Sequence, residues 1–299
     1  MNKIYNLLIV FSFIGLWLTS IIPDTYEVIL GFILIFSFGM LHGSNDMLLI
    51  DVISNKKRTQ SFLKVIAIYI ATVLAAATLF IFIPALALVL FILFSAYHFG
   101  EQHWESKSLN VLKWHKQLFY FIYGLFVLFL LFVLNSLEVI QIIKSISNIV
   151  IGTNAILIAF CIIAAALLGI SLYLTAHSVT FKLVVLKEFF YLVVFAIVFK
   201  VSTLIWGFAL YFIIWHSFPS LYEQIHFIYG RFTKKTIIAY IKKALPYWLV
   251  SIVALFSLIY IFGDTTIPYG IIFAFIAAVT FPHALVIKKM FEKHKTPNS

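Results

Sequence analysis

The sequence predicts an all-α, polytopic integral membrane helical bundle of about ten transmembrane helices with both termini cytoplasmic. Three observations predict this fold class. The 299 residues are 64% hydrophobic and only 11% charged, whereas a soluble domain carries roughly 25% charged residues. Apolar runs long enough to span a bilayer recur along the whole chain. Basic residues gather between alternate runs, as the positive-inside rule requires.

Each predicted span is an apolar run, because roughly 20 apolar residues cross a bilayer and fewer suffice where neighbouring helices shield the ends. The spans are 4–22, 26–49, 62–82, 84–100, 116–135, 150–174, 183–200, 201–229, 244–262 and 267–287. The first lacks a small-residue cleavage site and is therefore predicted to be an uncleaved span. The more polar stretch 136–149 is predicted to lie along the interface. Short turns near Pro84 and Lys200 are inferred from spacing and breaker residues, so about nine spans is the alternative.

The Lys and Arg residues indicate the orientation of the chain. With the N-terminus inside, all of them except Lys144 and Lys200 fall on segments predicted to be cytoplasmic. This asymmetry explains the formal net charge of +10 without a nucleic-acid partner. No linker divides the chain, so residues 1–299 are predicted to form one multi-pass domain in the inner (plasma) membrane of the cell. Cys161 is the only cysteine, which excludes a thiolate metal cluster.

Four histidines lie on even-numbered spans: His42, His98, His216 and His283. Each follows the outer start of its span by about 14–16 residues, which places all four about 21–24 Å from the outer face. Ionisable groups at membrane depth are rare and functional by default. Imidazole is the commonest protein metal ligand, and histidine sites without thiolate suit iron, copper or zinc. These four histidines are therefore predicted to bind one metal ion; interhelical hydrogen bonding is the alternative for each.

Three carboxylates follow these histidines at helical spacing. Asp46 comes four residues after the first histidine and Glu101 three residues after the second, so each is predicted to share a helix face with it. A ligating histidine usually donates its second N–H to a carboxylate or a carbonyl. Either carboxylate can therefore orient the imidazole of its own helix. Glu223 lies two turns after the third histidine and can do the same or line a polar entrance.

Aromatic residues flank the four histidines, and the remaining histidines have other predicted roles. The predicted aromatic wall of a substrate tunnel consists of Tyr97, Tyr211, Trp215, Tyr222 and Phe281. Ordinary packing is the alternative for each one. The histidines predicted to be solvated or at the lipid headgroups are His103, His115, His177, His226 and His294. Gly43 and Gly100 are predicted either to leave room for a ligand or to allow tight packing.

The blocks HGSND, HFGEQ, YFIIWHSFPS and FPHALV resemble those of the Brp/Blh family of membrane β-carotene 15,15′-dioxygenases, in the family's order. The resemblance implies an Fe(2+) enzyme in the lipid bilayer that cleaves the central double bond of β-carotene with O₂. The products would be two molecules of all-trans-retinal, the chromophore of a downstream microbial rhodopsin. His42, His98 and His216 match the family's iron-ligand positions. The family's further histidine is replaced here by Ser220, which leaves His283 as the candidate for the fourth position.

The resemblance implies catalysis by positioning of the polyene, with no catalytic residue beyond the metal ligands and no general base. Other classes are a membrane haem- or metal-binding electron-transfer protein and a metal transporter. Each helix offers one histidine at a common depth, whereas a haem relay across the membrane suits paired histidines at two depths. Transporters usually place carboxylates at the midplane, whereas the acidic residues here lie near span ends. The histidine pairs of a di-iron desaturase are absent.

Overall fold

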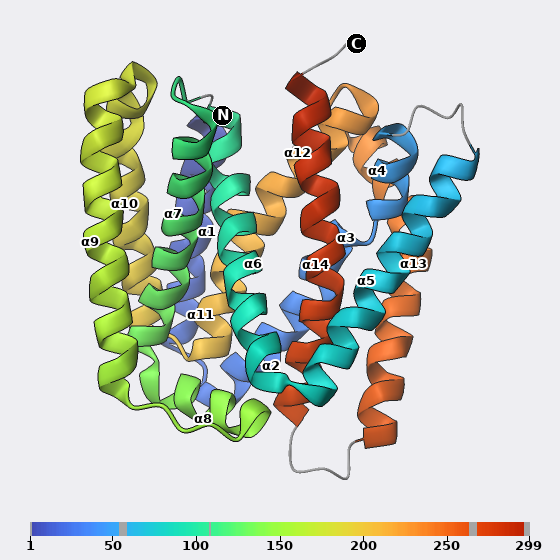
Figure 1. The fold of residues 1–299 in the computed structure, drawn as a ribbon, viewed down its shortest axis with the longest axis horizontal. Helices are drawn as coiled ribbons and strands as arrows, with labels where there is room; N and C mark the ends of the chain where they lie inside the picture. Colours follow the sequence, from blue (N-terminus) through green and yellow to red (C-terminus); the bar gives the residue numbers. More distant parts are fainter. Residues whose placement is uncertain (1, 54–58, 108, 263–267, 296–299) are drawn as a thin grey trace. The chain divides into compact units, whose positions relative to one another are not determined.

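The structure is a computed structural model that describes residues 2–53, 59–107, 109–262 and 268–295. Within these ranges the chain forms helices and no strand (Figure 1). The helices belong to two compact units. Unit 1 comprises Met1–Ile35, Ile92–Lys144 and Ile149–His216, and unit 2 comprises Phe36–Phe91, Ser145–Asn148 and Ser217–Ser299. A single domain over residues 1–299 stays a prediction.

Seven helical segments of the described residues are long and apolar enough to cross a membrane. They are Asp24–Ile53, Pro84–Lys107, Lys113–Leu134, Thr153–His177, Leu204–Tyr229, Lys234–Ile261 and Ile271–Lys293. The chain is therefore a multi-pass membrane protein. Two shorter apolar helices, Ile4–Thr19 and Ala67–Phe82, also lie on predicted spans. The count of about ten spans and the cytoplasmic termini stay predictions.

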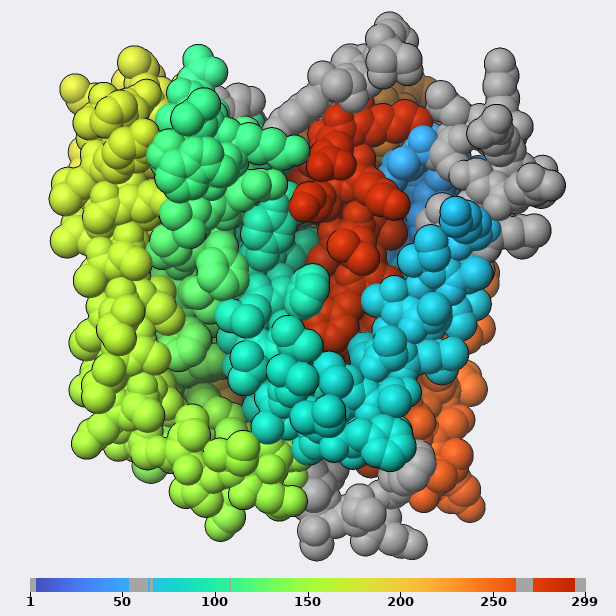
Figure 2. Space-filling model, viewed as in Figure 1, coloured from blue at the N-terminus to red at the C-terminus, as the bar shows by residue number. Residues whose placement is uncertain are grey.

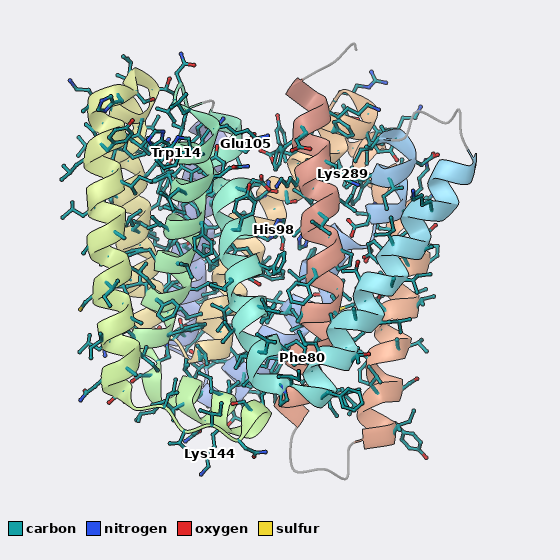
Figure 3. All side chains as sticks on the ribbon, in the orientation of Figure 1. Phe80, His98, Glu105, Trp114, Lys144 and Lys289 are labelled. Carbon is teal, nitrogen blue, oxygen red and sulfur yellow. The ribbon has the colours of Figure 1, made fainter. Side chains whose placement is uncertain are left out.

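Part of the charge pattern used for orientation can be followed within unit 1. Lys144 lies at one end of this unit, whereas Glu105 and Trp114 lie at the opposite end (Figure 3). This arrangement agrees with the prediction that Lys144 faces the other side of the membrane from the inner loops. The basic residues 56–58, on which the orientation also depends, lie outside the described residues.

Unit 1 is built from helices and short helical turns. Its elements are α1 (Asn2–Thr19), α2 (Asp24–Leu34), α6 (Pro84–Trp104) from Ile92 onward, η2 (Glu105–Lys107), α7 (Lys113–Leu134), α8 (Ser136–Ser147) up to Lys144, α9 (Thr153–His177), α10 (Val179–Val201), α11 (Leu204–Leu210) and η3 (Tyr211–Ser217) up to His216. α7 packs against α9 and α10, α1 packs against α10, and α11 packs against α2. α8 covers the stretch that the sequence predicts to lie along the interface.

Packing and polar bonds hold the helices of unit 1 together, since lipid supplies no hydrophobic force between transmembrane helices. Trp215 Nε1 donates to Ser12 Oγ at 2.9 Å, and Trp206 Nε1 donates to Thr19 Oγ1 at 2.9 Å. Both bonds tie the first helix to the segment from α11 to η3. The outer face of α9, yellow-green in Figure 2, exposes apolar side chains such as Ile162, as a lipid-facing helix should.

The N-terminus of α11 is held by two carboxylates from other helices of unit 1. Thr203 N donates to Glu27 Oε2 at 2.8 Å, and Leu204 N donates to Glu138 Oε2 at 3.3 Å. Carboxylates stabilise a helix N-terminus because its free N–H groups carry partial positive charge. Burial raises the pKa of Glu138, which lies on α8.

α6 and α7 approach each other so closely that two crossing positions require glycine. A Cβ atom on Gly100 would overlap the carbonyl oxygen of Tyr120. A Cβ atom on Gly124 would overlap the carbonyl oxygen of Ala96. Small residues permit such backbone approach in membrane proteins. The structure therefore assigns Gly100 to tight packing, one of the two roles predicted for it.

Unit 2 contains the remaining elements. They are η1 (Ile35–Gly39) from Phe36, α3 (Met40–Gly43), α4 (Asp46–Ile53), α5 (Thr59–Phe82), the start of α6, α12 (Phe218–Tyr229), α13 (Lys234–Phe262) and α14 (Pro268–Lys295). α14 packs against α5 and α4, and α13 packs against α3, α12 and α14. Lys293 Nζ on α14 donates to the last carbonyls of α4, those of Val52 and Ile53, at 2.9 and 2.7 Å. A cation at a helix C-terminus is favourable for the same electrostatic reason.

Candidate metal centre

Unit 1 contains two adjacent buried imidazoles. His98 lies on α6 (Figure 3) and His216 lies on η3; their ring centroids are 4.8 Å apart with an interplanar angle of 76°. Both side chains are almost fully buried. The ring of Phe212 stacks on that of His216 with their centroids 5.3 Å apart, and the ring centroid of Phe99 lies 4.7 Å from that of His216. Aromatic rings therefore pack against the His216 ring of this pair.

The segment that carries His216 is π-helical rather than α-helical. η3 covers Tyr211–Ser217 and is followed directly by α12. Pro219 has no N–H to donate to the carbonyl of Trp215 four residues earlier, which favours a departure from α-helical bonding here. Single π-helical turns occur frequently at functional sites. A second π-helix, η1, directly precedes the short helix that carries His42.

Unit 2 contains a second pair of imidazoles. His42 lies on α3 and His283 on α14, with ring centroids 4.8 Å apart and an interplanar angle of 87°. Both side chains are buried, with 4% and 3% of their surface exposed. The four histidines predicted from the sequence are thus found as two pairs, one in each unit.

Hydrogen bonds determine which nitrogen each imidazole of unit 2 presents. His42 Nδ1 is bonded to the carbonyl of Gly39, at the end of the π-helix η1. His283 Nδ1 lies 2.7 Å from Asp46 Oδ1. A carbonyl and a carboxylate can only accept, so both Nδ1 atoms carry the proton. In a neutral ring Nε2 then holds the lone pair that a metal ion can bind.

Asp46 was predicted to orient His42, and in this respect the prediction is corrected. Its carboxylate accepts from His283 on another helix. The turn at Ser44 and Asn45 separates α3 from α4, so the four-residue spacing does not place Asp46 above His42 on one continuous helix. The ring of His42 is instead held by the carbonyl of Gly39.

The other two predicted carboxylates, Glu101 and Glu223, lie close in sequence to His98 and His216. Glu101 is buried on α6, and its Oε1 accepts a hydrogen bond from Tyr97 Oη at 2.9 Å. The hydroxyl of Tyr97 is thereby directed along its own helix. Glu223 is half-buried on α12. That Glu101 and Glu223 support the histidines stays a prediction.

The five predicted tunnel residues have different surroundings. Tyr211 and Trp215 are buried in the aromatic core of unit 1, where each contacts the ring of Phe195. Phe281 belongs to an apolar cluster of unit 2. The ring centroids of Tyr222 and Phe232, in the same unit, are 4.9 Å apart. These contacts are those of ordinary packing, and a tunnel lined by Tyr97 and these residues stays a prediction.

Ser220 belongs to a buried polar network of unit 2. Gln224 Nε2 donates to Ser220 Oγ at 3.0 Å, and Tyr240 Oη donates to Gln224 Oε1 at 2.7 Å. Tyr240 Oη also lies 3.2 Å from the backbone carbonyl of His42. A small hydroxyl at position 220 therefore fits a network that reaches the backbone of the first histidine.

His103 was predicted to be solvated or at the headgroups, and this prediction is wrong. His103 is buried on α6, and its Nε2 lies 2.6 Å from Glu188 Oε2. Lys107 Nζ lies 2.8 Å from the other oxygen of the same carboxylate. The sequence signal was Glu188 itself, a carboxylate within an apolar run, which requires a buried partner.

The other histidines predicted to be solvated or at the headgroups differ in exposure. His177 and His226 are exposed, as predicted. His115 is partly buried between the rings of Trp114 and Tyr173. The side chain of His294 lies outside the described residues.

Within the described residues, no group of three or more His, Cys, Asp or Glu side chains could hold a metal ion. The described residues of each unit instead contain one pair of adjacent, buried imidazoles. Ionisable side chains in membrane-spanning segments are rare and functional by default, so these pairs are the candidate site of this multi-pass helical protein.

The comparison with protein families agrees with this class and narrows it. The family described as beta-carotene 15,15'-dioxygenase matches residues 33–291, a range that contains all four histidines. The chain therefore belongs to this family, as the resemblance of its histidine blocks indicated. No curated protein and no solved structure matches the chain.

Proposed function

We propose that the chain cleaves the central 15,15′ double bond of β-carotene with O₂ and releases two molecules of all-trans-retinal. The proposed cofactor is a non-haem Fe(2+) ion bound by His42, His98, His216 and His283. The observation that carries the proposal is the occurrence of these histidines as two buried pairs in a chain of the beta-carotene 15,15'-dioxygenase family.

The donor set suits a ferrous ion. Imidazole nitrogen is a common ligand of iron, and the bonds of His42 and His283 through Nδ1 leave Nε2 as the donor in each ring. The contact of Asp46 with His283 is the arrangement that usually accompanies a ligating histidine. When bound, ferrous iron supplies the redox chemistry that allows O₂ to react with the polyene.

The residues of the chain have two tasks in this proposal. The aromatic rings of Phe99 and Phe212, which pack around His216, exclude water from the reacting double bond. The membrane spans allow β-carotene to enter from the lipid bilayer, in which it is dissolved. Selection of the central bond then depends on position along the polyene rather than on acid–base chemistry. We infer no general base.

The experiment is expression in bacterial cells that accumulate β-carotene, with retinal measured by chromatography. The wild-type chain should bleach the cells and form retinal, and alanine at any of the four histidines should abolish both. His177→Ala is the matched control, because His177 is an exposed histidine at the end of α9. Unbleached cells that contain the wild-type protein in their membranes would refute the proposal.

Two further measurements test the metal and its ligands. The purified protein should contain iron without a Soret band, whereas a strong Soret band would favour a haem-binding electron-transfer protein. Iron content should fall in His283→Ala as it does in His98→Ala. Unchanged iron and activity in His283→Ala would remove this residue from the ligand set.

The proposed location is the inner (plasma) membrane, where a microbial rhodopsin can take up the retinal.

A further inference from the structure

We propose that Tyr69 is a positioning residue for His283 and that it acts through the carboxylate of Asp46. The effect of Tyr69 on iron binding rests on the function proposed above, in which His283 is a ligand. The effect of Tyr69 on the orientation of the His283 ring rests on hydrogen bonds within unit 2 alone. Tyr69 is not among the residues to which the sequence assigned a role.

The three side chains come from three different helices and form one chain of hydrogen bonds. Tyr69 Oη on α5 donates to Asp46 Oδ2 on α4 at 3.1 Å. Asp46 Oδ1 accepts from His283 Nδ1 on α14 at 2.7 Å. Asp46 and His283 are buried, with 2% and 3% of their surface exposed. Each oxygen of the carboxylate therefore has a donor from a different helix.

Two donors on opposite oxygens fix the plane of a carboxylate. With Tyr69 on Oδ2, the Asp46 side chain has little freedom to rotate Oδ1 away from His283. This contact keeps the proton on Nδ1 and the lone pair on Nε2. Without the hydroxyl, the same carboxylate is held at one oxygen fewer. The expected consequence is a less uniform ring orientation and tautomer at His283.

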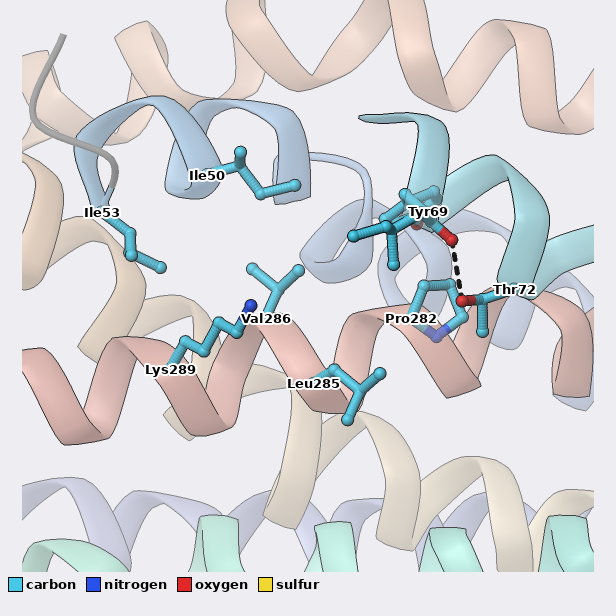
Figure 4. A pocket seen from close by; sticks show the side chains of 9 residues that line it. Ile50, Ile53, Tyr69, Thr72, Pro282, Leu285, Val286 and Lys289 are labelled. Atoms are coloured by element: carbon cyan, nitrogen blue, oxygen red, sulfur yellow. Dashed lines mark hydrogen bonds between the residues drawn. The ribbon is translucent and has the colours of Figure 1, made fainter. Parts of the chain in front are cut away.

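The surroundings of Tyr69 make its hydroxyl, rather than its ring, the effective group. The ring borders an apolar pocket of about 100 Å³ with Ile50, Pro282 and Val286 among its walls (Figure 4). Because close packing does not enclose the ring on every side, the bond to Asp46 contributes to its placement. Phenylalanine would fill the same space, so Tyr69→Phe tests the hydroxyl without a change of shape.

The experiment compares purified wild type, Tyr69→Phe, Asp46→Asn and the double variant. Tyr120→Phe is the matched control, because Tyr120 Oη donates to a carboxylate, that of Glu105, at 2.7 Å. The first readout is the dissociation constant for Fe(II), titrated anaerobically into metal-free protein. The second is the ¹⁵N spectrum of histidine-labelled metal-free protein, with His283→Ala used to assign the signal of His283.

Removal of a residue that supports a metal ligand typically weakens metal binding about 10–100-fold. We expect an effect in this range for Asp46→Asn and a smaller one, up to about 10-fold, for Tyr69→Phe. The double variant should bind Fe(II) as Asp46→Asn does, since Tyr69 acts through Asp46. The ¹⁵N signal of His283 should shift from protonated Nδ1 toward a mixture of tautomers in Tyr69→Phe. Tyr120→Phe should match wild type in both measurements.

Three results would overturn the proposal: an unchanged ¹⁵N signal of His283 in Tyr69→Phe, equal effects of Tyr69→Phe and Tyr120→Phe, or additive effects in the double variant. Failure of the wild type to bind Fe(II) would instead refute the proposed function. The ¹⁵N spectra, which need no metal, would then still decide the role of Tyr69. Should Tyr69→Phe aggregate, Tyr69→Leu also removes the donor from Asp46 and allows the same comparison.

Discussion

Gly100 offers a sharp test of the packing that places His98. A Cβ atom at this position would lie 2.6 Å from the carbonyl carbon of Tyr120 and 3.0 Å from its Cα, whereas ordinary contact begins at 3.4 Å. The carbonyl oxygen of Tyr120 would lie closer still, so in Gly100→Ala α6 and α7 must separate locally by at least about 1 Å. All three obstacles are backbone atoms, so no side-chain rotation can relieve the overlap. Overpacking of this kind typically costs about 1–3 kcal/mol.

The same shift should impair function, because His98 lies two residues before Gly100 on the same helix. A displacement of about 1 Å in a catalytic group can cost roughly 100-fold in rate. We expect Gly100→Ala to lower the midpoint of thermal unfolding in detergent by several degrees. Retinal formation should fall by about two orders of magnitude. Circular dichroism and chromatography of retinal measure the two effects.

Gly169→Ala is the matched control for this substitution. Gly169 also lies inside a transmembrane helix, α9, but a Cβ atom there would meet nothing within 4 Å. Alanine is the better helix former by about 1 kcal/mol, so this variant should be as stable as wild type or slightly more stable. If Gly100→Ala unfolds and functions like Gly169→Ala, the close approach of α6 and α7 is refuted.

Two further substitutions test polar contacts within the units. Glu188→Gln should lower the free energy of unfolding by about 3–5 kcal/mol, because it leaves the buried ammonium of Lys107 without its carboxylate; a denaturation midpoint equal to that of wild type would contradict this. Trp248→Phe should cost about 1 kcal/mol, because Trp248 Nε1 donates to the carbonyl of Phe36 in the π-helix η1 at 2.8 Å. Its thermal midpoint, compared with that of the exposed Tyr260→Phe, measures the loss, and equal midpoints would exclude a role for this bond.

The helices could be predicted from the sequence because hydropathy and length belong to each segment by itself. Every predicted span falls largely on a helix, and 136–149 largely on the separate helix α8. The family, too, could be read from short blocks around the histidines. The breaks were less visible: the turn at Ser44 and Asn45 and the π-helices η1 and η3 arise where backbone bonding changes without a change in hydropathy.

The sequence by itself determined that this is a helical membrane protein, since apolar length along a helix requires no partner; the common depth of its four histidines stays a prediction. Only the tertiary structure decided which side chains meet. Asp46 bonds to His283, 237 residues away, and His103 bonds to Glu188, 85 residues away. Such partners come from different helices, whose rotation and approach depend on packing. Depth follows from counting residues along one helix, but pairing depends on how several helices turn toward each other.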